Sequence, residues 1–346
     1  MICAMKKKSL LLGTLLTASV ATMAQDINFS QFYEMPLLRN PALSGMFRGD
    51  LRVSGAFRSQ WNSATSAYKT QALGVESKFG VSANTDDYIS FGLQLTNDIA
   101  GDSKMGKTQL LPVLAYHKSM SSEKDAYLSI GFIGGAVQQR FDPTGLKFDD
   151  QYVNGAYSPA NPTRQTFSNT NLIYWDAGVG LAYSSEAGSD LKYYVGASYY
   201  HFNQPKVAFN PVSDVRLNSK FSVNAGLSVP TSEYDNLMVF GDLFVQGGHS
   251  QAQGGFLFRH DLSQLGDEGE TVSIAAGAMY RLNDAVAPVI KLDYYQWSIG
   301  ASYDATISKL KNANGGRGGF EITLSYKNFL NIRNSSADKM RCPVSF

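Results

Sequence analysis

Apolar and polar residues alternate along most of this chain in segments of about ten residues. In the segment 297–304 one set of alternate positions holds Trp, Ile, Ala and Tyr, and the other holds Ser, Gly, Ser and Asp. The same alternation runs through 88–96, 172–184, 271–281 and 320–326. Because successive side chains of a β-strand point to opposite faces, the pattern predicts strands with one aliphatic and one small or polar face.

Fourteen candidate strands can be placed in this way. Most have the ~9–11 residues with which a tilted strand crosses a bilayer. They lie near 50–60, 70–80, 88–97, 107–117, 126–137, 172–184, 191–200, 220–229, 237–246, 252–260, 271–281, 286–293, 297–305 and 318–327.

The connections between these strands differ in length. Those after even-numbered strands are short, whereas 138–171, 201–219 and 306–317, after odd-numbered strands, are longer. Outer-membrane barrels have an even strand number, short periplasmic turns and long extracellular loops. A secreted β-sandwich could share the alternation but has no reason for this asymmetry. The sequence therefore predicts an all-β fold, an antiparallel transmembrane β-barrel that contacts outer-membrane lipid.

The N-terminus has the features of a secretion signal. A positive region at 6–8, an apolar stretch at 10–21 and small residues before Gln25 predict a signal peptide at 1–24. Its removal takes three lysines and no acid, so the net charge falls from +1 to about −2 and does not suggest a nucleic-acid partner. Tyr and Phe total 39 residues and charged residues only 17%, a balance typical of membrane barrels.

Four regions follow from this reading. They are the signal peptide (1–24), an N-terminal periplasmic or plug segment (25–49), the barrel (50–327) and a C-terminal periplasmic tail (328–346). Cys3 leaves with the signal peptide, so Cys342 in the tail is the only cysteine of the mature chain and no disulfide framework is expected.

The N-terminal segment is too rich in Pro and aromatic residues for a helix or a flexible linker. It reads FSQFYEMPLLRNPALSG from Phe29 to Gly45. We predict that it enters the inner, periplasmic end of the barrel as a plug, that Asn40-Pro41 turns the chain towards the first strand, and that Arg39 pairs with Glu76 or Glu321. The predicted plug residues are Phe29, Phe32, Tyr33, Leu37, Arg39, Asn40 and Pro41.

Charged residues of both signs fall on the inward face of the predicted strands. An ion-selective pore would carry a ring of one sign, whereas a nearly neutral mixture suits charges that pair with each other or with a plug. The alternative is the solvated lumen of a porin. The predicted lumen charges are Arg52, Arg58, Glu76, Asp176, Asp242, Arg281, Lys291, Asp293, Asp304 and Glu321.

Catalysis and cofactors find little support in the sequence. The four histidines share no zinc-like spacing, no G-x-S-x-G motif occurs, and GGRGG at 315–319 lacks the Lys-Ser/Thr of a phosphate-binding loop. We expect no enzyme and no cofactor. Asp98 with Asp102 could suggest calcium in an outer loop, although two carboxylates are a thin ligand set.

Several short motifs resemble one known family. NFSQFYEMPLLRNPALSG (28–45), FRSQW (57–61), TNDIAG (96–101), AYHKS (115–119), SYDATISKLKNANGGRGGFEITLSY (302–326) and RCP (341–343) occur in this order. Together they are similar to the PorP/SprF family of Bacteroidetes outer-membrane proteins, over nearly the whole mature chain. The resemblance implies an accessory barrel of type IX secretion and gliding motility. It also implies two kinds of partner, namely large surface adhesins with C-terminal secretion domains and periplasmic ring, motor or peptidoglycan-binding proteins.

Placed on the predicted barrel, three of these motifs gather at the outer rim. We predict that this rim, with the 138–171 loop, receives the folded domain of a partner; the alternative is that these residues only shape loops. The rim residues, all predicted in the first, second and last outer loops, are Trp61, Asn62, Asn97, Asp98, Gly101, Gly316, Arg317 and Gly318. Two other functions remain open at this point, a passive channel for small or hydrophobic solutes and a purely structural anchor.

Overall fold

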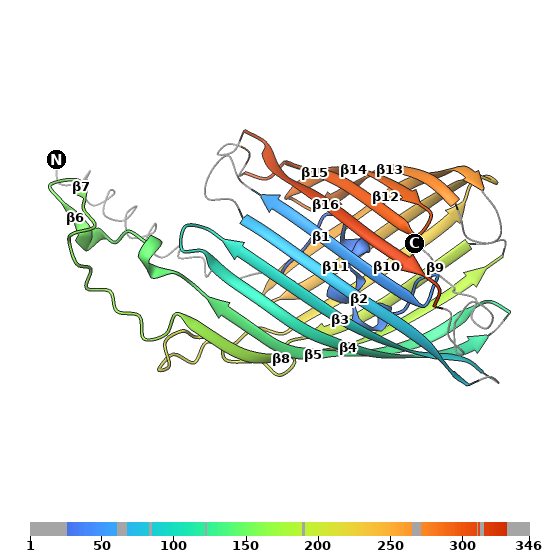
Figure 1. The fold of residues 1–346 in the computed structure, drawn as a ribbon, viewed down its shortest axis with the longest axis horizontal. Helices are drawn as coiled ribbons and strands as arrows, with labels where there is room; N and C mark the ends of the chain where they lie inside the picture. Colours follow the sequence, from blue (N-terminus) through green and yellow to red (C-terminus); the bar gives the residue numbers. More distant parts are fainter. Residues whose placement is uncertain are drawn as a thin grey trace, which may run out of the picture.

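The computed structural model describes residues 26–60, 68–82, 85–121, 123–188, 191–264, 271–309, 311 and 315–330. The signal peptide, Trp61, Asn62 and Cys342 lie outside these ranges. Fourteen of the strands in the described part form one closed antiparallel barrel, in which each strand pairs with the next along the chain (Figure 1). The predicted fold class is therefore confirmed.

The observed strands match the fourteen predicted positions, and most extend a few residues further. The barrel strands are β1 (Leu51–Gln60), β2 (Tyr68–Ser82), β3 (Thr85–Ala100), β4 (Met105–Ser121), β5 (Ala126–Arg140), β8 (Asn171–Ala187), β9 (Leu191–Tyr200), β10 (Lys220–Pro230), β11 (Asp235–Gln246), β12 (His249–Gln264), β13 (Thr271–Arg281), β14 (Ala285–Tyr294), β15 (Trp297–Thr306) and β16 (Arg317–Asn328).

A small hairpin lies outside the barrel and was not predicted. It consists of β6 (Tyr152–Val153) and β7 (Ala156–Tyr157), two strands too short to show alternation. Asn154 and Gly155 between them both have positive φ (52° and 81°), as a two-residue hairpin turn with this residue pair requires.

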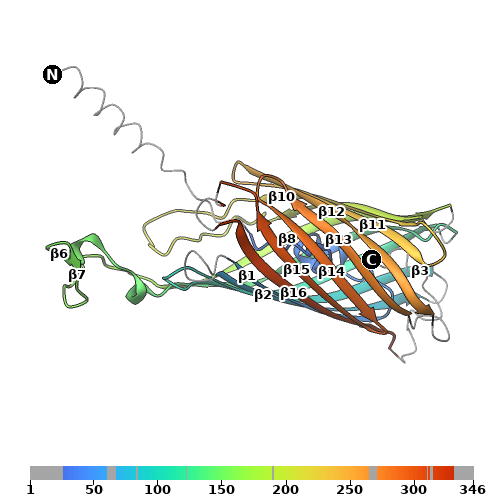
Figure 2. The ribbon, with the colours of Figure 1, turned by 90° about the horizontal axis from the view of Figure 1, so that it is seen from above.

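The first and last strands close the barrel. Ten residue pairs join β1 to β16, from Leu51 with Asn328 to Gln60 with Gly319, and Figure 2 shows the closed wall from a second direction. Among the described residues, no helix is long and apolar enough to cross a membrane.

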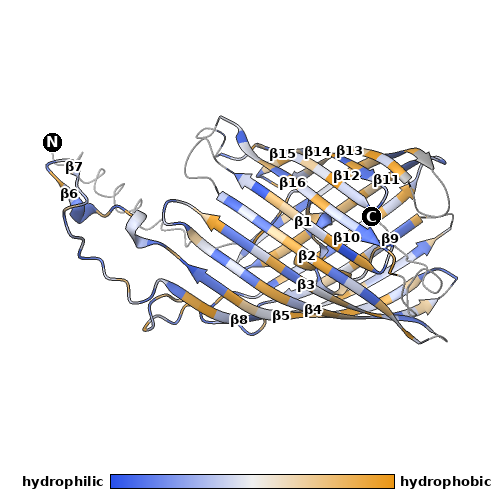
Figure 3. Cartoon of the chain, in the orientation of Figure 1, coloured by the Kyte–Doolittle hydropathy of each residue, from blue (hydrophilic) through white to orange (hydrophobic). Residues whose placement is uncertain are grey.

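The wall places its apolar side chains outside and its polar side chains inside. On β15, Trp297, Ile299 and Tyr303 are about half exposed, whereas Ser298 and Asp304 are buried in the lumen. Figure 3 shows the resulting bands of hydrophobic and hydrophilic residues along the strands. This inverted distribution is typical of a barrel whose outer surface faces lipid.

The two ends of the barrel differ in their connections. One end, here called the short-turn end, carries the connections 83–84, 122–125, 188–190, 231–234, 265–270 and 295–296. The other, the long-loop end, carries 61–67, 101–104, 141–170, 201–219, 247–248, 282–284 and 307–316. The 141–170 loop projects well beyond the barrel and carries β6 and β7 (Figure 1).

Candidate functional site

Residues 26–50, here called the N-terminal segment, lie inside the barrel. The segment contains three short 3-10 turns, Phe32–Glu34, Pro36–Leu38 and Pro41–Leu43. Asp26 contacts Lys220 at the long-loop end, and the Asp50 amide donates to the Asn328 carbonyl at the short-turn end (2.8 Å). The segment therefore spans the whole lumen, which is further than the predicted entry into the inner end alone.

Aromatic and aliphatic side chains of the segment pack against the inner wall. The Tyr33 ring stacks on Phe240 of β11 at 4.8 Å between centroids, and Phe32 meets Phe240 edge-on at 6.4 Å. Leu37 and Phe29 are also fully buried. Each such side chain contributes about 1.5–3 kcal/mol when it is removed from water.

Arg39 forms the central ion pair of the lumen, and its partner differs from the predicted Glu76 or Glu321. Its guanidinium contacts Asp242 of β11 at 2.5 Å and donates to the Tyr194 hydroxyl at 2.8 Å. The prediction was wrong because strand parity shows which acids point inward but not their height along the lumen. Glu76 instead pairs with Arg52 (2.6 Å), and Glu321 accepts from the backbone amides of residues 30 and 31.

Asn40 and Pro41 fit against a wall of glycines. The Asn40 side chain accepts from the Ala42 amide (2.9 Å) and donates to the Leu181 and Ala197 carbonyls of β8 and β9. Glycine leaves room for these two residues, because a Cβ on the wall would collide with Asn40 or Pro41 at three positions. It would lie 2.3 Å from the Pro41 carbonyl carbon at Gly131, and 1.9 Å and 2.6 Å from the Asn40 amide at Gly180 and Gly196.

The other predicted lumen charges also lie inside the barrel, and most have partners. Lys291 pairs with Glu34 of the segment at 2.6 Å, and Asp304 lies between Arg58 (2.6 Å) and Arg281 (2.9 Å). Asp293 accepts from Ser273 and Ser298. Acidic and basic side chains thus pair with each other and with the segment. Among the described residues, the lumen carries no ring of like charges.

A cluster of charges that the sequence did not reveal surrounds Asp26 at the long-loop end. The Asp26 carboxylate contacts His201 (2.8 Å), Lys107 (3.2 Å) and Lys220 (3.4 Å), and His201 also contacts Asp176 (2.8 Å). Burial alone would lower the pKa of His201, but the two carboxylates raise it to about 9. Burial would raise the pKa of Asp26, but His201 and the two lysines hold it well below its ordinary value. The contacts therefore favour the charged forms of both groups.

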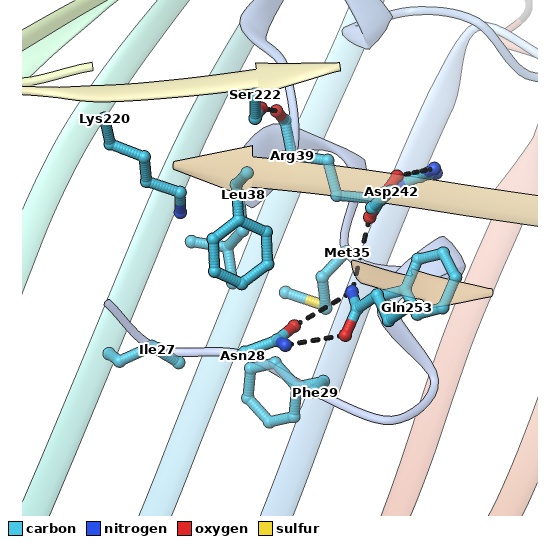
Figure 4. A pocket seen from close by; sticks show the side chains of 12 residues that line it. Ile27, Asn28, Phe29, Met35, Leu38, Arg39, Lys220, Ser222, Asp242 and Gln253 are labelled. Carbon is cyan, nitrogen blue, oxygen red and sulfur yellow. Dashed lines mark hydrogen bonds and ion pairs between the residues drawn. The ribbon is translucent and has the colours of Figure 1, made fainter. Parts of the chain in front are cut away.

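A small cavity remains between the N-terminal segment and the wall. It is lined by residues such as Asn28, Phe29 and Gln253 (Figure 4). The Asn28 and Gln253 side chains exchange two hydrogen bonds across it (2.6 and 3.1 Å). Its volume is about 30 Å³, which is room for about two water molecules.

The predicted rim residues that the structure describes all lie at the long-loop end. Asn97 and Asp98 are not in a loop as predicted but near the end of β3, where they accept from Thr108 (3.0 Å) and Thr70 (2.6 Å). The polar Asn-Asp pair interrupts the apolar alternation, but the strand continues to Ala100. Gly101 and Gly316 lie in turns with positive φ (67° and 80°). Arg317 and Gly318, also predicted in an outer loop, begin β16, and two strands, β1 and β2, lie between β16 and β3.

The predicted calcium pair does not form a recognisable ligand set. Asp98 accepts from Thr70, and no group of three His, Cys, Asp or Glu side chains in the described part of the chain is arranged to hold a metal. His117, on β4, lies between the hydroxyls of Ser90 and Ser129.

The sequence matches one family model, described as type IX secretion system membrane protein PorP/SprF, over residues 21–326. The chain belongs to the PorP/SprF family. It is therefore a type IX secretion system membrane protein, and its closed barrel places it in the outer membrane. No curated protein sequence matches it significantly.

Solved structures with a similar fold are distant in sequence. A FadL homologue from Pseudomonas aeruginosa is 9% identical, with a TM-score of 0.48 over 83% of this chain and 92% of that one. The deltaS2 mutant of the TodX monoaromatic hydrocarbon channel is 12% identical, with a TM-score of 0.41 over 86% of this chain and 94% of that one. BamA from Haemophilus ducreyi is 9% identical, with a TM-score of 0.40 over 81% and 70%.

Proposed function

We propose that this PorP/SprF protein is a non-enzymatic docking barrel of the type IX secretion system. Its long-loop end would receive the C-terminal domain of a large secreted surface adhesin. Its short-turn end would face the periplasmic ring, motor or peptidoglycan-binding proteins. Long loops outside and short turns inside are the usual arrangement of outer-membrane barrels.

The observation that carries this proposal is the occupied lumen. Residues 26–50 cross the barrel from end to end, and their charged groups pair with the wall. A passive channel for small or hydrophobic solutes is the alternative, and a lumen filled in this way counts against it. A barrel whose lumen is occupied by its own chain is better suited to binding than to transport.

The 141–170 loop supports docking at the long-loop end. Most of its residues are exposed, and Tyr152, Val153 and Phe167 each expose between two fifths and just over half of their surface. Exposed aromatic and aliphatic groups gathered on one projection are typical of a protein-binding surface.

Shortening this loop tests the proposal. Residues 143–168 would be replaced by a short Gly-Ser linker, which leaves β5 and β8 intact. We expect the variant to insert normally, with unchanged heat-modifiable migration in gels, but to lose the adhesin C-terminal domain in pull-downs from native membranes. The matched control is Val212→Ser, at the exposed tip of the neighbouring 201–219 loop. Unchanged recovery of the adhesin domain by the shortened variant would contradict docking at this loop.

The same pull-down separates the remaining functions. Recovery of periplasmic ring or peptidoglycan-binding proteins without an adhesin would support a structural anchor. Solute flux through the wild-type barrel in liposomes, with no recovered protein, would support the channel.

A further inference from the structure

The contacts of the N-terminal segment show in which direction it runs through the barrel, which the sequence did not predict. Ser30 donates to Asp304 of β15 (2.5 Å), which is two residues from the long-loop end of that strand. Further along, the Gly45 amide donates to Glu76 (3.0 Å), nearer the short-turn end of β2. The chain therefore advances from the long-loop end at Asp26 to the short-turn end at Asp50.

The start of this path is fixed by the charge cluster around Asp26. Three cationic side chains, from β4, the residue after β9 and the first residue of β10, converge on the single carboxylate. Asp176 of β8 holds the His201 ring from its other side. Ion pairs that are largely shielded from solvent are screened much less by salt than surface pairs are, so the cluster can hold the chain end in place.

From this geometry we propose that the mature N-terminus of the protein is displayed on the outer surface of the membrane and that Asp26 latches it there. With cleavage before Gln25, as the sequence predicts, one residue precedes Asp26. This proposal rests on the same barrel orientation as the proposed function, in which the long-loop end faces outward. It does not depend on any partner.

Single cysteines can test the exposure of the N-terminus, because Cys342 is the only cysteine of the predicted mature chain. In a Cys342→Ser background, Gly-Cys-Ser would be inserted between Gln25 and Asp26, and intact cells would be treated with a membrane-impermeant maleimide. The reference variants are Val153→Cys in the exposed hairpin and Ser232→Cys in an exposed short turn. All variants are first checked for heat-modifiable migration.

We expect the inserted cysteine to be labelled in intact cells as fully as Val153→Cys, whereas Ser232→Cys is labelled only after permeabilisation. Labelling of the insertion only after permeabilisation, while Val153→Cys reacts in intact cells, would overturn the proposal and leave the orientation standing. Failure of Val153→Cys to react in intact cells would overturn the orientation and, with it, the display of the N-terminus.

The latch has a separate test. Asp26→Asn removes the charge that the two lysines and His201 contact, so the inserted cysteine should react several-fold faster with the maleimide. Asp150→Asn, an exposed acid of the long loop, should leave the rate unchanged. An unchanged rate in Asp26→Asn would show that Asp26 does not hold the chain end.

Discussion

The N-terminal segment and the 141–170 loop are built alike but lie in opposite environments. Both contain aromatic residues and short 3-10 turns and lack long strands or helices. Nearly every residue of the segment is buried, whereas most of the loop is exposed. The difference lies in the surface that each one meets, since the segment finds matching charges and glycine gaps in the lumen and the loop projects away from the barrel. Irregular structure by itself therefore does not tell whether a stretch is a plug or a binding surface.

Removing the N-terminal segment should open a conductance, whereas removing the loop should not, and this is the largest expected difference. Deletion of residues 26–45 removes the segment from the lumen, so we expect steady single-channel currents in planar bilayers. Wild-type protein and the loop-shortened variant should both remain silent. A silent barrel after the deletion, with insertion confirmed, would show that the segment does not seal the lumen.

A buried ion pair of the lumen should contribute much more to the free energy of unfolding than an exposed ion pair of a loop. Arg39→Ala leaves Asp242 buried without its guanidinium partner, which should lower the free energy of unfolding by about 3–5 kcal/mol. The matched control is Arg216→Ala, whose pair with Asp214 is exposed on the 201–219 loop and should contribute about 0–1 kcal/mol. Urea unfolding in lipid vesicles measures both, and equal effects would contradict the comparison.

Filling a glycine gap should displace the segment from its wall. In Gly131→Ala the new Cβ would lie 2.3 Å from the Pro41 carbonyl carbon, so we expect a loss of about 1–3 kcal/mol from overpacking. Gly241→Ala is the control, because a Cβ there meets no atom within 4 Å. Equal urea midpoints for the two variants would indicate that the segment does not pack on Gly131.

The charge cluster at Asp26 should weaken at high pH. The pKa of His201 is raised to about 9 from its ordinary value near 6.5, so the stabilisation is complete below about pH 6.5 and is lost as the pH rises through about 9. We expect a loss of about 2–3 kcal/mol between pH 7 and 10 that is absent in His201→Gln. The charged and titratable groups around His201 and Asp26 are Asp176, Tyr200, Lys107 and Lys220. A wild-type pH profile parallel to that of His201→Gln would assign the change to these other groups.

Substitutions at the tip of the long loop should have the smallest effect on stability. Tyr152→Ser with Val153→Ser alters exposed side chains outside the barrel, so the free energy of unfolding should change by less than about 0.5 kcal/mol. Recovery of the adhesin C-terminal domain should nevertheless fall. A large loss of stability would mean that the hairpin packs against the barrel.

The fold was largely predictable because membrane strands must alternate at every position. The alternation in segments such as 297–304 located all fourteen strands, and the motifs from Asn28 to Tyr326 indicated the family. The candidate site was less predictable. The sequence predicted that the N-terminal segment lies in the lumen. It did not predict that Arg39 pairs with Asp242, or that Asn97 and Asp98 lie in a strand.

The sequence by itself determined the barrel, its two unlike ends and the mixed charge of its inner face, because these depend on residue parity and loop length. Only the tertiary structure decided which charges meet and which way the N-terminal segment runs. Closing the barrel sets the height of each side chain along the lumen, and that height brings His201, Lys107 and Lys220 to Asp26. These contacts join residues 81 to 194 positions apart in the chain, so no local pattern in the sequence could have shown them.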